Sequence, residues 1–301
     1  MSALKGYTRE GRRAGARNHV LILPTVVCSV RLSHDIAEIT TATTVSHQHG
    51  CGHIGPDIAQ TRSLYAGLAT NPNVAHAVLT SLGCETVQGA SVAQALDRRG
   101  LPAPLVEIHS AGGYESALAD GVAVTQPLVA GAGSQARTDH PLSDLLVGLS
   151  VSREDDRIEP LVRSLRESGS SVVVAVQSAT GALAASAACA VGEAPTEPLS
   201  VVKNAGAGAQ QLASLAACGA QVIVDFVAPG QPPQGFPIVP VVTVGSADPL
   251  HVLVAEDFDL TVDATVDDIS GTVRSVFSGA VTRAEARRSS TLAVPRLLRT
   301  M

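Results

Sequence analysis

The sequence predicts an α/β protein with two doubly wound, mainly parallel α/β domains, and three observations lead to that class. Short runs rich in Val, Leu and Ile alternate along the chain with longer segments rich in Ala and Leu, as strands alternate with covering helices in such folds. Aromatic residues make up 2% of the chain and hydrophobic residues 45%, so aliphatic side chains must fill the cores. A length of 301 residues suits about two domains.

The first domain is predicted over residues 1–135. Its strands and helices alternate strictly, which implies right-handed crossovers between parallel strands. Pro56 favours a helix start, because the first helical position needs no backbone donor. In chain order we predict strand 20–27, helix 30–39, strand 43–45, helix 56–68, strand 74–82, helix 91–99, strand 104–108 and a helix from 111 to about 124.

A second α/β domain is predicted over residues 141–301, after a linker at 131–141. The alternation restarts there, and prolines and glycines at 229–240 predict a rigid loop. An Ala-rich segment at 182–190 is assigned to a helix. We predict strands at 145–151, 172–176, 221–227, 239–244 and 260–262, and helices at 158–167, 182–190, 206–217, 249–255, 266–277 and 284–288.

Charge and cysteine usage narrow the function classes. The net charge of −6 and the scarce aromatic residues argue against a nucleic-acid binder, which normally has a basic face or stacking platforms. No apolar run reaches the roughly 18 residues of a membrane span. The run at 20–27 contains Pro24 and is followed by charged residues, so we interpret it as a buried strand rather than a secretory signal. Five cysteines, an odd number, favour a reducing compartment, and we expect a cytoplasmic protein.

Reactive side chains are most concentrated at residues 46–53, which read SHQHGCGH. Histidine and cysteine are common ligands of transition metals, and glycine lets a backbone fold closely around a small ligand. A surface turn that happens to hold histidines is the simpler interpretation. However, Cys28 and Cys84 stand in similar settings, each close after a predicted strand. We therefore predict a functional site at this stretch.

Several reactive residues share one position relative to the predicted strands, because each falls just after a strand end. Parallel strands end at the same edge of a sheet, where the ligands of doubly wound folds bind. The residues expected to converge there are Cys28, His47, His49, Cys51, Cys84, Glu85 and His109. Cys189 and Cys218 lie in Ala-rich segments instead, and we interpret both as core residues.

Two features lie outside this group. Arg17 and Asn18 stand directly before the first strand, in an arm that holds further arginines. A guanidinium can bind a carboxylate through two parallel hydrogen bonds, so this pair is a candidate anion grip, and a solvated arm is the alternative. The segment 206–208 reads GAG like part of a dinucleotide loop, but it lacks a strong preceding strand and a third glycine in register, so it carries little weight.

The arm and the strand-end motifs together resemble a known family. The motifs are GYTREGRR at 6–13, RN at 17–18, PTVVC at 24–28, HQHGCG at 47–52, NPN at 71–73 and LGCE at 82–85, with a weaker match at 217–220 and 259–264. In order and spacing they resemble the altronate/galactarate dehydratase family, which includes the large subunit of a sulfolactate sulfo-lyase. The resemblance implies an iron-dependent lyase that removes water, or sulfite, from a small hydroxy acid or sugar acid. It also implies a flavodoxin-like first domain that carries the Cys/His site.

The second domain departs from that family. A Cys-Gly-Gly-Ser-Asp-like stretch usually follows the strand that opens the domain, whereas this chain reads SVSRED at 150–155. The family's long insertion in this domain is also missing, so the domain is shortened. The small extra domain of the family has no counterpart in the chain, which leaves a small partner subunit or a homo-oligomer as alternatives. A non-catalytic, metal-binding subunit of a larger dehydratase complex is the competing function.

Two iron sites fit these residues. The first model is a mononuclear iron bound by some of His47, His49, Cys51, Cys84 and Glu85. The second is a [4Fe–4S] cluster held at three corners by Cys28, Cys51 and Cys84, because such clusters are bound by thiolates. Zinc is a third alternative.

The remaining roles follow from what a dehydration needs. A base must remove the proton next to the carboxylate, while a metal helps the hydroxyl to depart. We expect His49 or Glu85 to be the base. Arg17 and Asn18 would hold the substrate carboxylate, and His53 would at most support a ligand.

Overall fold

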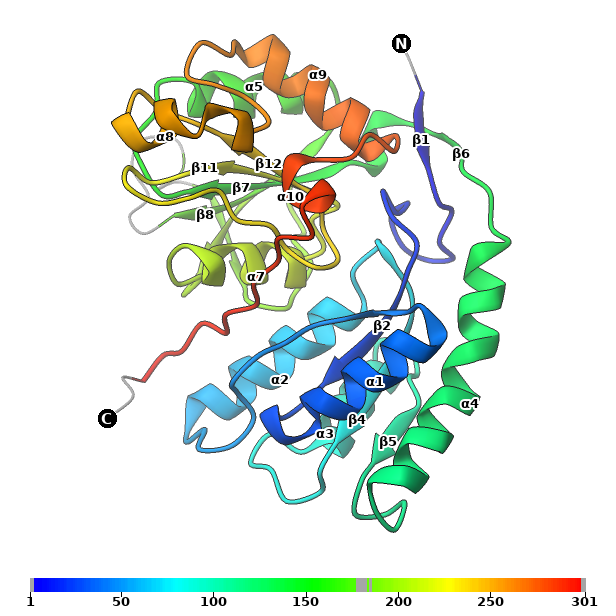
Figure 1. Cartoon of the computed structure of the whole chain (residues 1–301). Coiled ribbons are helices and arrows are strands. Elements are labelled where there is room, and N and C mark those ends of the chain that lie inside the picture. The colour runs from blue at the N-terminus through cyan, green and yellow to red at the C-terminus, as the bar shows by residue number, and fades with distance from the viewer. Residues whose placement is uncertain (1–2, 177–182, 184–185, 299–301) are drawn as a thin grey trace.

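The first half of the chain forms a parallel four-stranded sheet in the computed structural model, which describes residues 3–176, 183 and 186–298 (Figure 1). Its strands lie in the order β3-β2-β4-β5, so that the first strand sits between the second and the third. The strands are β2 (His19–Pro24), β3 (Thr43–Thr44), β4 (Val74–Ser81) and β5 (Leu105–Glu107). This order places a topological switch point between β2 and β4.

Helices cover both faces of this sheet. On one face α1 (Val30–Thr40) and α4 (Tyr114–Gly133) pack over Ile22 and Val78. The other face is covered by α2 (Pro56–Ala69) and α3 (Gly89–Asp97). In α1 the buried Leu32 and Ile36 stand four residues apart, the spacing of one helix face.

The second half forms a six-stranded sheet among the described residues, and all of its neighbouring strands are parallel. The order is β12-β11-β7-β8-β10-β9. The strands are β7 (Leu146–Val151), β8 (Ser171–Val176), β9 (Ala187–Ala190), β10 (Leu199–Lys203), β11 (Val222–Phe226) and β12 (Val241–Val244). With both sheets parallel and layered by helices, the predicted α/β class is confirmed.

The helices of the second half also form two layers. One face of the sheet packs against α5 (Ile158–Glu167) and α9 (Val266–Phe277), and the other against α7 (Ala209–Ala217). Shorter elements complete the chain: η1 (Val27–Ser29), η2 (Leu142–Asp144), α8 (Pro249–Leu253), η3 (Ala255–Asp257) and α10 (Arg283–Ala286).

The two halves share one apolar core. Side chains of α2 and α7 belong to the same cluster of buried residues, which reaches from the first sheet to the second. The helices approach closely at Gly67, where an added Cβ would lie 2.3 Å from the carbonyl oxygen of Ala217. Larger side chains would therefore separate the two halves.

Three expectations about the second half are wrong. The described end of the predicted helix 182–190 is strand β9, in which only Cys189 is buried, and residues 182, 184 and 185 lie outside the described residues. Strand β10 was not expected, and it stands directly before the Gly-rich turn at 206–208. The predicted strand 260–262 is reduced to a single bridge between Leu260 and Val244.

The N-terminal arm is anchored rather than solvated. Its strand β1 (Leu4–Gly6) pairs antiparallel with β6 (Thr138–His140) in the predicted linker. The side chain of Arg9 donates a 2.9 Å hydrogen bond to the carbonyl of Pro72. The arm therefore ties the start of the chain to both halves.

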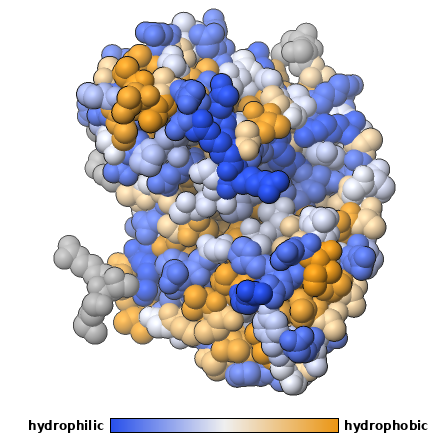
Figure 2. All heavy atoms as spheres, viewed as in Figure 1, coloured by the Kyte–Doolittle hydropathy of each residue, from blue (hydrophilic) through white to orange (hydrophobic). Residues whose placement is uncertain are grey.

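The surface mixes polar and apolar side chains on the face shown in Figure 2, and apolar side chains gather over α8. Val252 and Leu253 of that helix are 62% and 81% exposed. Within the described ranges, no helix combines the length and the apolar character needed to cross a membrane.

Candidate functional site

The switch point of the first sheet brings together the segments that follow β2 and β4. Cys28 lies on η1, just beyond β2, and Cys84 lies in the loop after β4. Residues 46–53, which we call the histidine loop, follow β3 at the same edge. Crevices of this kind, beyond the carboxyl ends of parallel strands, are where doubly wound folds bind ligands.

Three exposed thiols meet at this edge: the thiol cluster, Cys28, Cys51 and Cys84. Desolvation, followed by the charges of the Cys28 and Cys84 thiols, raises the pKa of the Cys51 thiol. The two neighbours therefore lie within electrostatic range of Cys51, although Cys28 and Cys84 are more than fifty positions apart in the sequence. Thiols that interact in this way can bind one group together.

Gly50 fits the histidine loop against the turn after β2. Its φ of +106° suits glycine, and an added Cβ would lie 2.4 Å from the carbonyl oxygen of Thr25. Backbone hydrogen bonds hold the loop on both sides, from Val27 N–H to the His49 carbonyl (2.8 Å) and from Val87 N–H to the Gly50 carbonyl (3.0 Å). The loop is thereby fixed next to Cys28 and Cys84.

Glu85 is buried beneath the same edge. Its carboxylate accepts hydrogen bonds from Gly83 N–H (2.7 Å) and from the Thr25 hydroxyl (3.2 Å), so each oxygen has a donor. An added Cβ on Gly83 would lie 3.0 Å from His109 Nδ1, which places His109 at this edge too. Glu85 therefore joins the ends of β2 and β4 from a buried position.

His47 has a structural role in this arrangement. It is buried, its Nε2 donates to the Pro24 carbonyl at 2.7 Å, and its Nδ1 accepts from His49 N–H at 3.2 Å. The ring also stacks on Tyr65 with 5.4 Å between centroids. Both ring nitrogens of His47 are therefore engaged within the protein.

His49 and His53 face each other across the loop, with ring centroids 5.9 Å apart. The only hydrogen bond to His49 Nε2 within the described chain is a long one, 3.4 Å, from Val294 N–H. Burial, followed by the neighbouring His47 and His53, lowers the pKa of His49 to about 4, so the ring is neutral at pH 7. His53 is buried and bonds Thr61 through Nδ1 at 3.0 Å, whereas its Nε2 has no partner among the described residues.

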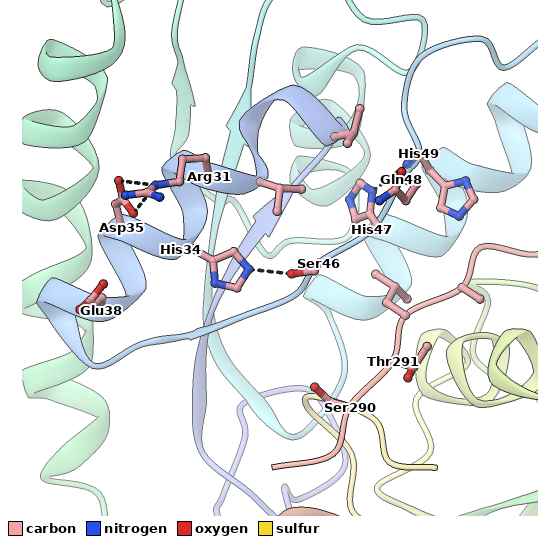
Figure 3. Close-up of a pocket in the computed structure, with 14 residues that line it drawn as sticks. Arg31, His34, Asp35, Glu38, Ser46, His47, Gln48, His49, Ser290 and Thr291 are labelled. Atoms are coloured by element: carbon pink, nitrogen blue, oxygen red, sulfur yellow. Dashed lines mark hydrogen bonds and ion pairs between the residues drawn. The ribbon is translucent and has the colours of Figure 1, made fainter. Parts of the chain in front are cut away.

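A cavity of about 820 Å³ opens beside the histidine loop (Figure 3). Its walls come from α1, from residues 46–49 and from residues 290–293. On the α1 side Arg31 pairs with Asp35 at 2.7 Å, and His34 contacts Ser46 at 2.6 Å. The cavity is large enough for a small organic acid, and His49 faces it from the loop side.

Arg17 and Asn18 lie away from this site, which corrects their assignment as a carboxylate grip. They precede β2, at the opposite end of the strand from Cys28. Arg17 binds both carboxylate oxygens of Glu285, at 2.7 and 2.8 Å. Asn18 accepts from Arg9 and donates to the Ala132 carbonyl, both at 2.7 Å. Their polar groups hold the fold together and are not available to a substrate.

No motif in the sequence indicates that residues 290–298, the C-terminal segment, belong to the site. This segment runs from the second half down past α2 (Figure 1). Arg296 pairs at 2.9 Å with Asp57, which is fully buried at the start of α2 and also accepts from Leu297 N–H at 2.6 Å. Val294 donates to His49 and accepts from the side chain of Gln210 at 3.2 Å. The segment therefore connects the histidine loop to the N-terminus of α7.

Sulfur is the donor type that gathers at this edge. Across residues 3–176, 183 and 186–298, no three or more His, Cys, Asp or Glu side chains are placed so that they could hold one metal ion. The thiol cluster instead brings three exposed sulfurs around a common edge, and thiolates are the ligands of iron–sulfur clusters. In donor chemistry, three thiols at one edge therefore match the ligand type of such a cluster.

The first half of the chain is similar to known proteins. Residues 6–133 match the model of the second domain of D-galactarate dehydratase/altronate hydrolase. The altronate dehydratase of Bacillus subtilis (strain 168) is 30% identical over 162 residues, which are 50% of this chain and 32% of that protein. That of Escherichia coli (strain K12) is 32% identical over 101 residues, 30% of this chain and 20% of that protein. The matches thus span about a third or less of these relatives.

A solved structure of D-2-hydroxyisocaproate dehydrogenase aligns with 80% of this chain and 76% of its own, at 11% identity and a TM-score of 0.21. A similarity this low supports no conclusion about the fold or the function of this chain. The family model covers the segment that holds most of the arm, the histidine loop and the thiol cluster. Residues 6–133, less than half of the chain, are therefore similar to the second domain of D-galactarate dehydratase/altronate hydrolase.

Proposed function

We propose that this chain is a hydro-lyase that removes water from a small hydroxy acid or sugar acid. The observation that carries the proposal is the convergence of three exposed thiols at the switch point of a domain related to dehydratases. The cavity beside the histidine loop has the volume that such a substrate requires. A lyase that expels sulfite would need the same site with a different pocket.

We further propose that the thiolates of Cys28, Cys51 and Cys84 hold an iron–sulfur cluster. When bound, the cluster would act as a Lewis acid that helps the substrate hydroxyl to depart. The Gly50 contact keeps Cys51 in reach of the other two thiols, because it fixes the loop on the turn after β2. Glu85 would keep the ends of β2 and β4 together beneath the thiols.

His49 is our choice for the base, on geometric grounds. His49 lines the cavity, and among the described residues its Nε2 is engaged by one long hydrogen bond, whereas Glu85 is buried and each of its oxygens has a donor. In the reaction His49 takes the proton from the carbon next to the carboxylate. The electrons of that C–H bond form the double bond as the C–O bond breaks, and the hydroxyl leaves as water after gaining a proton. The enol that results becomes a 2-keto acid.

The decisive experiment combines metal analysis with proton exchange. The full chain is purified without oxygen, its iron and sulfide are measured, and D-altronate and D-galactarate are incubated with it in D₂O. We expect iron with sulfide, and deuterium at the carbon next to the carboxylate. Cys51→Ser should lose iron and exchange, while His49→Gln should keep iron and lose exchange. Cys189→Ala is the control, because it removes a buried thiol of the second half that is not part of the thiol cluster. This variant should keep both the iron and the exchange.

Two outcomes would contradict this model. Iron and sulfide that persist in Cys51→Ser would show that the thiol cluster is not the ligand set. Iron bound as expected, with no exchange on any hydroxy acid tested, would instead support a non-catalytic, metal-binding subunit.

A further inference from the structure

A second cavity lies between the two halves of the protein, away from the thiol cluster. It has a volume of about 620 Å³, and we call it the seam cavity. Its walls come from the N-terminal arm, the C-terminal ends of α2 and α7, and the loop after β9. Leu101 and Leu146 give it apolar surface. Neither the proposed reaction nor the family resemblance assigns a role to it.

Three arginines line the seam cavity: Arg12 and Arg13 from the arm, and Arg99 from the end of α3. Among the described residues none of them forms an ion pair with a carboxylate at salt-bridge distance. Glu193 is the single acid among the described lining residues. Burial lowers the pKa of Arg99, and the negative charge of Glu193 partly offsets that effect by raising it. The lining therefore carries a net positive charge of two at neutral pH.

The guanidiniums are held in place by uncharged acceptors. Arg12 donates to the Thr70 carbonyl at 3.1 Å, and Arg13 to the Ser143 carbonyl at 2.8 Å. Arg99 donates to the Gly192 carbonyl at 2.8 Å. The carbonyl acceptors come from both halves of the chain and fix the positions of the three guanidiniums. Because carbonyl groups are uncharged, they do not neutralise the positive charges. Preorganised guanidiniums of this kind suit planar, two-point recognition of an oxyanion.

One donor in this group has no acceptor. Arg12 Nε is buried and makes no hydrogen bond among the described residues. Because this nitrogen is enclosed by protein, an anion in the cavity would be bound by the terminal nitrogens of the guanidiniums and not by Nε. Burial lowers the pKa of all three guanidiniums, so the charged forms are already desolvated and would gain from a counter-ion.

We propose that the seam cavity binds a small molecule that carries a doubly charged oxyanion group, through the guanidiniums of Arg12, Arg13 and Arg99. A dianion matches the net charge of the lining. The oxyanion would lie at the guanidiniums, and the rest of the ligand against Leu101 and Leu146. A phosphate ester and a dicarboxylate share this chemistry. The site does not depend on the proposed dehydratase activity, since no residue of the histidine loop lines it.

The test measures binding of inorganic phosphate and of tartrate to the full chain by calorimetry, in a buffer free of other oxyanions. Arg99→Gln should weaken binding about tenfold or more, the value of one charge-assisted hydrogen bond. Arg98→Gln is the matched control, because it removes the same charge from the adjacent exposed residue, which does not line the cavity. It should change the affinity less than twofold or so.

A second readout reports on the Arg12 guanidinium. The Nε–H resonance of Arg12, identified by its absence in Arg12→Lys, should shift as phosphate or tartrate is added, because the anion binds the terminal nitrogens of the same guanidinium. Binding of phosphate alone would assign the site to a phosphate ester, and binding of tartrate alone to a dicarboxylate. No binding of either anion, equal weakening by the Arg98 and Arg99 variants, or a stationary Arg12 Nε–H signal would each overturn the proposal.

Discussion

Replacing Arg296 with methionine should loosen the C-terminal segment and lower the free energy of unfolding. Arg296 Nε lies 2.9 Å from Asp57, whose side chain is fully buried, while the arginine side chain is 18% exposed. Methionine keeps much of the apolar stem but removes the charge. The variant therefore leaves a buried carboxylate without its cation.

The size of the loss follows from what Asp57 retains. Removing one partner of a buried ion pair typically costs ~3–5 kcal/mol. Here the carboxylate keeps the N–H of Leu297 at 2.6 Å, and the lost guanidinium was partly hydrated. We therefore expect a loss of about 2–3 kcal/mol at pH 7. Arg287→Met, which breaks the more exposed pair with Asp257, is the control and should cost ~1 kcal/mol or less.

The loss should depend on pH in a defined direction. Burial alone would raise the pKa of Asp57, but the Leu297 N–H and the Arg296 guanidinium outweigh it and hold that pKa below its usual value. A depressed folded-state pKa means that the carboxylate stabilises the fold above about pH 4 and that this contribution is lost as the pH falls through the folded value. The difference between wild type and Arg296→Met should therefore shrink in acid.

Urea unfolding at pH 7 and at pH 3 measures both effects, and limited proteolysis reports release of the C-terminal segment. A loss no larger than that of Arg287→Met at pH 7 would refute the argument, as would a difference that grows on acidification.

Two further predictions concern the thiols and the loop. Ellman's reagent should react rapidly with the thiol cluster in the native protein without metal. The buried Cys189 and Cys218, whose sulfurs lie 3.8 Å apart, should react only after unfolding. If all five thiols reacted equally fast, the burial of these two would be contradicted. Gly50→Ala should lower the unfolding free energy by about 2 kcal/mol or more, because its Cβ would clash with the Thr25 carbonyl at a positive φ. A calorimetric melting temperature unchanged from wild type would show that the loop can move aside.

The alternation of apolar runs predicted the first sheet well, because parallel strands buried on both faces need continuous Val, Leu and Ile. The same logic placed Cys28, Cys84 and Glu85 at one edge, and the structure brings them together there. Strand β9 was missed because its alanines favour a helix in isolation, whereas pairing with β10 decides its conformation.

Side-chain roles were harder to predict than their positions. Arg17 and Asn18 border a strand, but sequence proximity does not show which end of the sheet a ligand occupies. The residue type of His47 suggests a ligand, whereas its ring nitrogens hold the backbone of its own loop and of β2. Contacts such as Arg296 to Asp57 span more than two hundred residues, and no local pattern records them.

The close packing of α2 on α7 has a consequence for how the two halves can be exchanged. A fragment that ends near residue 135 would expose the apolar side of α2, including Leu64 and Leu68, which are buried in the core shared with the second half. Any domain that replaces the second half must place a backbone equally close to Gly67, without a bulky side chain in between. This requirement holds whatever catalytic residues that domain contributes. The close contact between α2 and α7 therefore restricts which domains can be fused to the first half of this chain.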